Sequence, residues 1–565
     1  MKFNDLQYKR PDFDQDLQSL NQYLDTLENA ENSEEFFDAH KKYEDKMAQF
    51  AEMYTVAYIR NSIDTRDEFY EKEVEAFDQI IPKFSQAGNR LQNIRLISEF
   101  RKEFEDKYGT NITKTDELQK NIFKPEIMED RVEEAKLTQE YQKLTGTAEF
   151  EFEGKSYNLS SFSPVLQDKD RARRKAAQET MTKWFEERKE DFDRIYDELV
   201  KIRTRIANKL GFDSYIDVAY RSFGRTDWDR DDAKNYRDQI YKYIVPLAQK
   251  YYKEQAKRIG IEDMKYYDLN LNFISGNPTP KGDENHLVKL AKDMYAELSP
   301  ETEEFFNKMV ENEMMDLSSK AGKAPGGYMT SLPVTKLPFI FANFNGTAHD
   351  AEVLTHEAGH AFQGYLVRDV YPSDNQSACM EIMETHSMSM EYFTHPWMKE
   401  FFKEDTEKFL YNHVVGSIQF LPYGASIDEY QEWVYDNPQA SPQERNTKFR
   451  EIQKKYNPEI DYEDNHFMEE GRRWQRQGHV YSSPFYYLDY TIAQVNAFQF
   501  FVMDMEDHKD AWEKYLDLCK LGGKYGTKET IEKVGLKNPF EEETFKYIVP
   551  KLEEYIESLD HSKIK

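Results

Sequence analysis

The five residues from position 356 to position 360 constrain the fold of this chain more than any other segment does. They read His356-Glu357-Ala358-Gly359-His360. Residues four apart share one face of an α-helix, so both imidazoles can reach one zinc ion while Glu357 stands beside a water molecule on that ion. This spacing has chemical meaning only on a helix. The segment therefore predicts a helix that carries a zinc peptidase site.

The residues before this segment support the predicted helix. Residues 339–346 are rich in aromatic and β-compatible side chains and end in Asn-Gly, which predicts a short strand and a turn. Asp350 is the expected N-cap of the following helix, and apolar residues at helical spacing continue from it. Two interpretations of the strand stay open. It is either an exposed edge that pairs with an extended peptide or part of a small sheet that covers the helix.

Two histidines do not complete a catalytic zinc site, which usually has three protein ligands and one water. A second helical stretch over residues 379–391 carries Glu381, Glu384 and Glu391 at spacings of three and seven. Residues at these spacings share a helix face. Most acidic helix faces are solvated, but the methionines around these carboxylates indicate burial. The third ligand is therefore expected from this stretch.

Together the two segments resemble the M3 family of zinc oligopeptidases, most closely its oligoendopeptidase F and Pz-peptidase branch. In that family the third ligand is a glutamate followed by Ser three residues later and Glu seven residues later. Glu384 matches this register. The resemblance implies one Zn²⁺ per chain, held by His356, His360 and Glu384. Glu381 is the alternative third ligand. If Glu384 is the ligand, we expect the carboxylate of Glu381 to support the ligands or the local structure.

The resemblance extends to residues 478–490, which are similar to the His- and Tyr-rich segment that lines the active-site cleft of the family. It implies that His479 holds the substrate backbone or helps to stabilise the oxyanion formed during hydrolysis. A tyrosine hydroxyl aimed at that oxyanion lowers the barrier by about 3 kcal/mol. Tyr486 and Tyr490, one helical turn apart, are the first choice for this donor. Tyr487, which shares a face with Tyr490, is the alternative.

The same resemblance implies the architecture and the activity. The expected fold is mainly α: one elongated helical metallopeptidase body with a deep central channel and a small β-sheet next to the zinc helix. Such a channel admits short peptides and excludes folded proteins. The expected reaction is hydrolysis of internal bonds in short peptides, with Glu357 as the general base that takes a proton from the attacking water and passes it to the departing amine.

Several properties stay open at this level. The Pz-peptidase likeness suggests proline-rich or collagen-derived peptides as substrates. The natural substrate, the oligomeric state and the replacement of zinc by cobalt or manganese are not determined. A dipeptidyl carboxypeptidase would share the metal site but needs a cation that holds the substrate carboxylate. A non-enzymatic peptide-binding protein is the alternative from another class, and Glu357 argues against it because a structural metal needs no adjacent base.

Apolar periodicity indicates how the chain is organised. Residues 14–96 and 191–258 repeat apolar positions at helical spacing, whereas residues 148–159 alternate around a glycine and predict a small hairpin. We expect an N-terminal helical region over residues 1–190 that contains this hairpin. A catalytic helical region with the zinc site follows over residues 191–565. No linker separates them, so one continuous structural unit is expected.

Composition excludes other classes of function. The net charge is −30, with acidic residues spread along the chain, so a nucleic-acid partner is not expected. Two cysteines are too few for a disulfide-stapled secreted domain. No apolar stretch has the length of a signal peptide or a membrane span. We therefore expect a cytoplasmic enzyme with no membrane partner.

Overall fold

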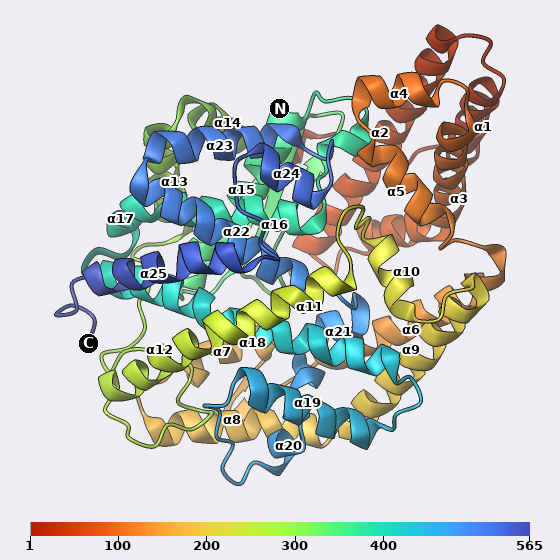
Figure 1. Ribbon diagram of the computed structural model, residues 1–565. Helices are drawn as coiled ribbons and strands as arrows, with labels where there is room; N and C mark the ends of the chain where they lie inside the picture. The colour runs from red at the N-terminus through yellow and green to blue at the C-terminus, as the bar shows by residue number, and fades with distance from the viewer. Residues whose placement is uncertain (1) are drawn as a thin grey trace.

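The computed structural model describes residues 2–565, and most of these residues are helical. The first five helices project from one corner of the molecule, at the upper right of Figure 1. They pack around an apolar cluster of their own that includes Leu20, Phe36 and Phe77. Helices predicted over residues 14–96 are confirmed. The five are α1 (Phe13–Glu28), α2 (Ser33–Ile63), α3 (Glu68–Ile97), α4 (Arg101–Tyr108) and α5 (Asn111–Lys120).

A second group of helices follows, with the predicted hairpin among them. The hairpin pairs β1 (Phe150–Phe152) with β2 (Lys155–Tyr157) in antiparallel register, and its turn residues Glu153 and Gly154 both have positive φ. Two successive left-handed residues suit a two-residue hairpin turn. The hairpin is therefore confirmed. The helices of this group are α6 (Met128–Gly146), α7 (Leu159–Leu166), α8 (Arg171–Glu186), α9 (Lys189–Leu210), α10 (Tyr215–Ser222), α11 (Arg230–Gln239) and α12 (Val245–Arg258).

The remaining helices carry the candidate site. Helix α16 packs against both α15 and α22. The helices are α13 (Glu284–Leu298), α14 (Pro300–Glu311), α15 (His349–Val367), α16 (Met380–Phe393), α17 (Met398–Phe402), α18 (Thr406–Asp436), α19 (Pro442–Tyr456), α20 (His466–Glu469), α21 (Gly478–Ser482), α22 (Tyr487–Glu506), α23 (His508–Leu521), α24 (Thr527–Lys533) and α25 (Glu542–Ser558).

Helix α22 lies at the centre of the largest apolar cluster. Its residues from Leu488 to Val502 are buried around almost the whole circumference, except Tyr490. A helix that is buried on all sides must be enclosed by other elements, and α16 and α18 pack against it. The cluster draws on residues from Ile127 to Ile564. The division of the chain at residue 190 stays a prediction, since this cluster takes residues from both sides of it.

A three-stranded sheet lies beside helix α15, as predicted. Its order is β3-β5-β4, formed by β3 (Met315–Ser318), β5 (Leu337–Phe344) and β4 (Tyr328–Leu332). Strand β5 pairs in parallel with β3 and antiparallel with β4. The short strand before the zinc helix is therefore confirmed. Its interpretation as an exposed edge is wrong, because β5 is the central strand and both its edges are paired.

The predicted cap of helix α15 is also wrong. The helix begins at His349 with Ala348 as its N-cap, and no side chain caps it. Asp350 lies inside the first turn, where its carboxylate accepts hydrogen bonds from the backbone N–H groups of Asn345 and Gly346 at 2.9 and 2.8 Å. The side chain stabilises the turn that leaves β5 instead of the first turn of the helix.

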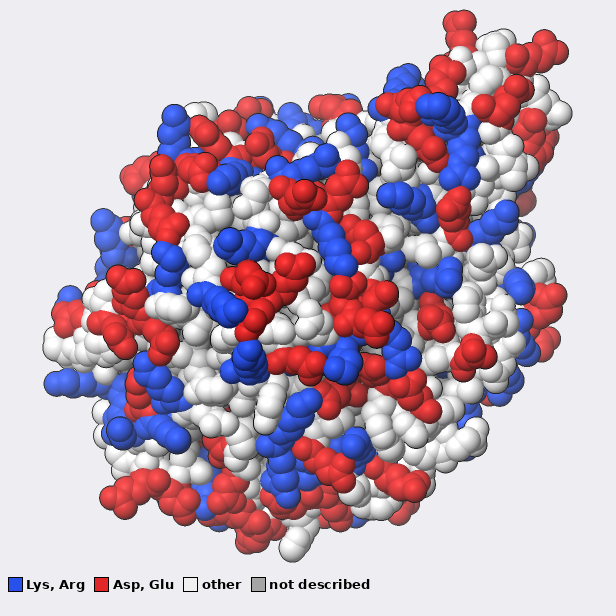
Figure 2. Space-filling view, in the orientation of Figure 1, with Lys and Arg blue, Asp and Glu red and all other residues white. Residues whose placement is uncertain are grey.

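Charged side chains of both signs mix over the molecular face drawn in Figure 2. Acidic side chains are frequent on this face, consistent with the net charge of −30. Within residues 2–565, no helix combines the length and the apolar character needed to cross a membrane.

Candidate metal centre and active site

Helices α15 and α16 approach each other closely at Gly359. A Cβ atom on Gly359 would lie 2.6 Å from the Cα atom of Ser387 and 2.9 Å from the carbonyl oxygen of His386, both in α16. Real Cβ atoms are not found so close to backbone atoms, so only glycine fits here without a shift of one helix. The missing side chain allows the acidic helix to lie directly against the helix that carries both histidines.

We expect the substitution Gly359→Ala to push the two helices apart. Such overpacking costs about 1–3 kcal/mol, which outweighs the gain in helix propensity. Thermal unfolding should show a lower Tm, and metal affinity should fall because Glu384 moves away from the histidines. Gly416→Ala in α18 is the matched control, since its Cβ would meet no atom within 4 Å. A Gly359→Ala protein as stable as the Gly416→Ala protein contradicts the close-packing argument.

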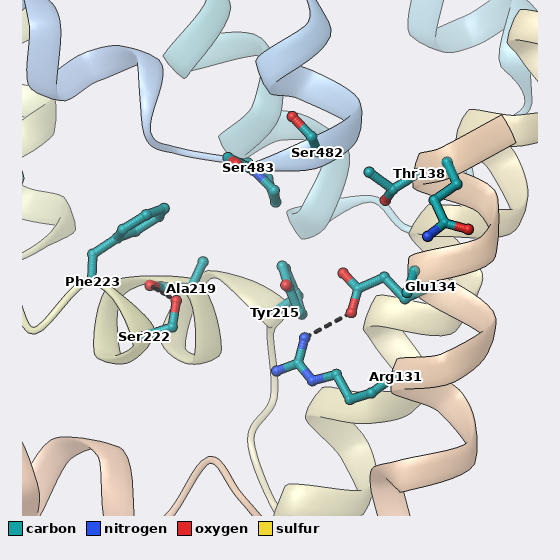
Figure 3. A pocket seen from close by; sticks show the side chains of 12 residues that line it. Arg131, Glu134, Thr138, Tyr215, Ala219, Ser222, Phe223, Ser482 and Ser483 are labelled. Carbon is teal, nitrogen blue, oxygen red and sulfur yellow. Dashed lines mark hydrogen bonds and ion pairs between the residues drawn. The ribbon is translucent and has the colours of Figure 1, made fainter. Parts of the chain in front are cut away.

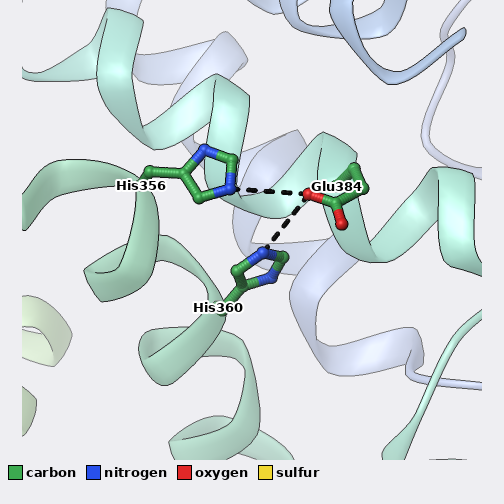
Figure 4. Close-up of side chains that lie close together, drawn as sticks. All are labelled: His356, His360 and Glu384. Carbon is green, nitrogen blue, oxygen red and sulfur yellow. Dashed lines mark ion pairs between the residues drawn. The ribbon is translucent and has the colours of Figure 1, made fainter. Parts of the chain in front are cut away.

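The structure brings the three predicted metal ligands together. Figure 4 shows the rings of His356 and His360, one turn apart on α15, pointing at the carboxylate of Glu384 on α16. Their Nε2 atoms lie 3.5 and 3.4 Å from Oε2 of Glu384. One ligand atom from each of the three residues can be chosen so that all lie within 4.8 Å of one another. Two imidazoles and one carboxylate are a common donor set of catalytic zinc.

Glu381, the alternative ligand, is engaged elsewhere. Its carboxylate accepts a hydrogen bond from the indole N–H of Trp228 at 2.6 Å and another from the hydroxyl of Thr527. The side chain is buried. It therefore ties α16 to the segments that carry Trp228 and Thr527, while Glu384, three residues later, faces the histidines. This geometry favours Glu384 as the ligand.

The carboxylates near the histidines differ in their pKa. Burial opposes ionisation of Glu384, but the neighbouring imidazoles outweigh burial and hold the pKa of Glu384 well below its usual range. Burial likewise opposes ionisation of Glu391, but His356 and His413 lower its pKa to about 2. Burial raises the pKa of Glu357. Against the effect of burial, Glu384 and Glu391 in turn raise the pKa of His356, so a metal that binds here would displace a proton from His356 and be balanced by the two carboxylates.

A chain of buried hydrogen bonds extends behind His356. Its Nδ1 lies 2.7 Å from Oε1 of Glu391, whose Oε2 lies 2.7 Å from Nε2 of His413. The Nδ1 atom of His413 then lies 2.8 Å from Nε2 of His395. A carboxylate behind a ligating histidine fixes its tautomer and ring orientation. Sequence reasoning missed both outer histidines, and no spacing signal could have found them because they lie on separate elements.

The substitution Glu391→Gln tests this support. We expect zinc affinity to fall about 10- to 100-fold, because the amide cannot hold the Nδ1–H of His356 as a carboxylate does. The measurement is competition with a metal chelator of known affinity. Glu400→Gln is the control, since Glu400 is exposed and pairs with Lys403 at 2.7 Å. Equal zinc affinities for the two variants would remove the supporting role from Glu391.

His479 and three tyrosines form an aromatic group beside the candidate ligands. The ring centroid of His479 lies between 5.2 and 5.7 Å from those of Tyr486, Tyr487 and Tyr490. The hydroxyl of Tyr486 donates a hydrogen bond to Oε1 of Glu384 at 2.7 Å. The rings of Tyr486 and Tyr490 have centroids 4.9 Å apart. The structure thus brings all four predicted aromatic residues together and joins them to Glu384.

Gln477 determines where His479 carries its proton. The Nε2 atom of Gln477 lies 2.7 Å from Nδ1 of His479, and its Oε1 accepts from the hydroxyl of Tyr423 at 3.3 Å. An amide nitrogen only donates, so Nδ1 is the acceptor and a neutral ring carries its proton on Nε2. Burial lowers the pKa of His479, which favours this neutral form. His479 therefore offers an N–H donor.

The backbone before Tyr486 is strained and held in place. Phe485 has φ of 72°, an unusual value for a bulky residue. Its carbonyl accepts from Arg225 at 2.8 Å, and its N–H donates to Oε1 of Gln431 at 3.1 Å. Arg225 also binds Asp489 at 2.7 Å. These buried contacts position the start of α22, and sequence reasoning missed them because the partners lie far apart in the chain.

A cavity of about 440 Å³ adjoins this segment. Figure 3 shows Ser482, Phe223 and the side chains of Arg131 and Glu134 around it. Phe223 stacks on Tyr486 with ring centroids 5.9 Å apart. Arg131 and Glu134 form an ion pair at 2.7 Å. The cation in this cavity already has a carboxylate partner.

Two family models match the chain. "Peptidase M3 N-terminal domain" matches residues 3–123, and "Peptidase family M3" matches residues 165–549. Oligopeptidase PepF of Bacillus subtilis (strain 168) is 22% identical over 552 residues, which cover 92% of this chain and 79% of the relative. An oligoendopeptidase F homolog of Lactococcus lactis subsp. lactis (strain IL1403) is 24% identical over 400 residues, or 66% of this chain. The chain spans 62% of the length of that relative.

Solved structures are also similar to the chain. A structure described as Pz peptidase A with an inhibitor has a TM-score of 0.95 and 44% sequence identity, with 100% of both chains covered. The oligoendopeptidase F of Enterococcus faecium has a TM-score of 0.63 and 16% identity, with 98% of both chains covered. The second likeness concerns the fold alone.

Proposed function

Because the chain belongs to peptidase family M3, and within it to the oligoendopeptidase F branch, we propose that it is a zinc-dependent endopeptidase that cuts short peptides at internal bonds. The observation that carries this proposal is the convergence of His356, His360 and Glu384, with Glu357 adjacent to the first histidine. A structural metal site has no use for a base beside it. The geometry therefore supports a catalytic site.

The donor set supports zinc as the metal. Two imidazole nitrogens and one carboxylate oxygen lie close enough to share one ion, and His356 has the carboxylate partner typical of zinc sites. A zinc ion held by these residues would act as a Lewis acid and lower the pKa of a water molecule bound to it.

Glu357 is the proposed general base. Its buried carboxylate takes the proton from the attacking water and passes it to the nitrogen of the departing amine. Burial raises its pKa, which makes the carboxylate a better proton acceptor than an exposed glutamate. One side chain thus carries out both proton transfers.

We assign oxyanion stabilisation to Tyr490 and His479. The hydroxyl of Tyr486 already donates to Glu384, so its first role is to orient that ligand. Tyr490 packs against Tyr486 and His479, and its hydroxyl is the donor that we expect to reach the carbonyl oxygen under attack. Tyr487 also lies next to His479 and Tyr490, with ring centroids 5.2 and 5.9 Å away, so it stays the alternative donor. The Nε2–H group of His479 is the second donor.

The proposal also covers the length of the peptides that reach the candidate active site. We propose that a channel limits access to short, unstructured peptides, since the branch carries names such as oligopeptidase and oligoendopeptidase. Proline-rich or collagen-derived peptides are candidate substrates because of the likeness to Pz peptidase A. A cytoplasmic location belongs to the same proposal.

Mass spectrometry of a digest tests this function. The zinc-loaded protein is incubated with a mixture of short peptides and one folded protein, with and without a chelator. We expect internal cuts in short peptides only, and none after chelation. Removal of C-terminal dipeptides instead of internal cuts would favour the dipeptidyl carboxypeptidase. Absence of any cut by the zinc-loaded protein would leave the peptide-binding protein as the better account.

A further inference from the structure

A second cavity, of about 360 Å³, contains two arginines, Arg473 and Arg476, whose side chains are both half-buried. Tyrosine and amide side chains line the rest of its polar wall, among them Tyr423, Tyr462 and Gln477. The hydroxyl of Tyr423 already donates to Gln477, whereas the amide nitrogen of Gln477 has a second N–H besides the one directed at His479. The two arginines make the lining cationic, in a chain whose net charge is −30.

Neither arginine has a carboxylate partner within 4.0 Å in the part of the chain that the structure describes. Arg473 lies over the ring of Tyr423, with its guanidinium carbon 4.7 Å from the ring centroid. Arg476 contacts the sulfur of Met181 at 3.2 Å. Glu459 lies beyond ion-pair distance of Arg473, and although the charge of Arg473 lowers the pKa of Glu459, burial outweighs this effect and raises it.

Two guanidinium groups that share a cavity repel each other. Burial and the neighbouring charge of Arg473 both lower the pKa of Arg476. Holding two such cations together costs free energy unless an anion lies between them. In the cavity of Figure 3, by contrast, Arg131 has a carboxylate partner, Glu134, which also pairs with Arg203. The unpaired arginines thus indicate a site for a negatively charged ligand.

The cationic cavity adjoins the candidate active site. Gln477 lines the cavity and lies 2.7 Å from His479 through its amide nitrogen. Tyr423 also lines it, and its ring centroid lies 5.9 Å from that of Tyr487. One layer of side chains therefore separates the two arginines from the aromatic group at the candidate metal centre. A carboxylate held in this cavity would therefore lie next to the aromatic group of the candidate metal centre.

We propose that Arg473 and Arg476 bind a carboxylate of the peptide substrate and so help to determine which peptide bond lies at the metal centre. The inference rests on the proposed function, which makes peptides the ligands. Guanidinium groups bind carboxylates through paired, charge-assisted hydrogen bonds. The carboxylate is either the C-terminal one or that of an Asp or Glu side chain. Both present the same chemistry to the cavity.

Three peptides with the same residues around the cleavage site test the proposal. The first ends in a free carboxylate, the second ends in an amide, and the third ends in an amide but carries a Glu near that end. The ratio of kcat/KM between each acidic peptide and the neutral amide is measured for the wild type, Arg473→Gln and Arg476→Gln. Because one protein preparation cleaves all three peptides, the ratio does not depend on the folded fraction. The same ratio is measured for Arg473→Lys, which keeps the charge, and for Arg188→Gln, which is the control.

We expect the wild type to prefer one acidic peptide by about tenfold, as charged hydrogen bonds allow. Either Arg→Gln variant should bring that ratio close to one, and Arg473→Lys should retain part of it because the charge remains without the planar fork. Arg188→Gln should keep the wild-type ratio, since Arg188 lies outside the cavity and pairs with Glu187. Preference for the free C-terminus identifies the α-carboxylate, and preference for the third peptide identifies the side-chain carboxylate.

A wild-type ratio near one for both acidic peptides overturns the proposal. A clear preference that survives in both Arg→Gln variants also overturns it, because the selectivity then arises elsewhere. If the zinc-loaded wild type cleaves none of the three peptides, the proposed function fails, and this inference fails with it.

Discussion

Replacing Glu357 by Gln is expected to lower kcat for peptide hydrolysis by about a thousandfold. The amide can hydrogen-bond a water molecule but cannot accept its proton, so the chemical step loses its base. The candidate metal ligands are untouched, and zinc content measured by atomic emission should equal that of the wild type. The combination of retained metal and lost turnover is specific for a general base.

Glu400→Gln is the control for this experiment. Glu400 is exposed, pairs with Lys403 at 2.7 Å and lies on α17, a helix that carries none of the candidate ligands. We therefore expect wild-type turnover. If Glu357→Gln keeps more than about a tenth of the wild-type kcat, another group accepts the proton and the assignment is wrong.

The second large effect is expected from His356→Ala. This substitution removes one of the three proposed ligands, so zinc affinity should fall by more than the roughly 10- to 100-fold that loss of an outer partner costs. It also leaves Glu384 with one imidazole partner and deprives Glu391 of its hydrogen bond to the ring. Zinc content after dialysis and peptide cleavage should both fall close to zero.

His349→Ala provides the control for metal loss. His349 begins the same helix, but its side chain is 68% exposed and faces only Glu352 among the acids within ion-pair distance. The His349→Ala protein should bind one zinc ion and cleave peptides as the wild type does. Retention of one tightly bound zinc by His356→Ala would show that the ion is held elsewhere.

The sequence predicted the three candidate metal ligands because their geometry is local. Helical spacing alone places His356 and His360 on one face, and the acidic stretch has its own helical register. What brings Glu384 to them is the contact at Gly359, where a side chain would meet the backbone of α16. The glycine in the pentapeptide permits that contact, but no periodicity in the sequence predicts that α16 packs there. Mainly helical architecture and the small hairpin followed from apolar spacing in the same way.

The features that the sequence did not reveal depend on contacts between distant segments. His413 and His395 reach Glu391 from other elements, and Arg225 reaches Phe485 across 260 positions of the chain. The role of Asp350 was misjudged because an aspartate near a helix start can bond either to the helix or to the preceding turn. The central position of β5 likewise depends on β3 and β4, whose pairing no single strand pattern specifies.

Zinc titration of metal-free protein tests the central claim most directly. The protein is stripped with a chelator, zinc is added back in known amounts, and cleavage of a short peptide is followed at each step. We predict that activity is absent at the start, rises in proportion to zinc and stops rising at one ion per chain. Full activity of the stripped protein, or a rise that continues to two ions per chain, would contradict a single catalytic zinc held by His356, His360 and Glu384.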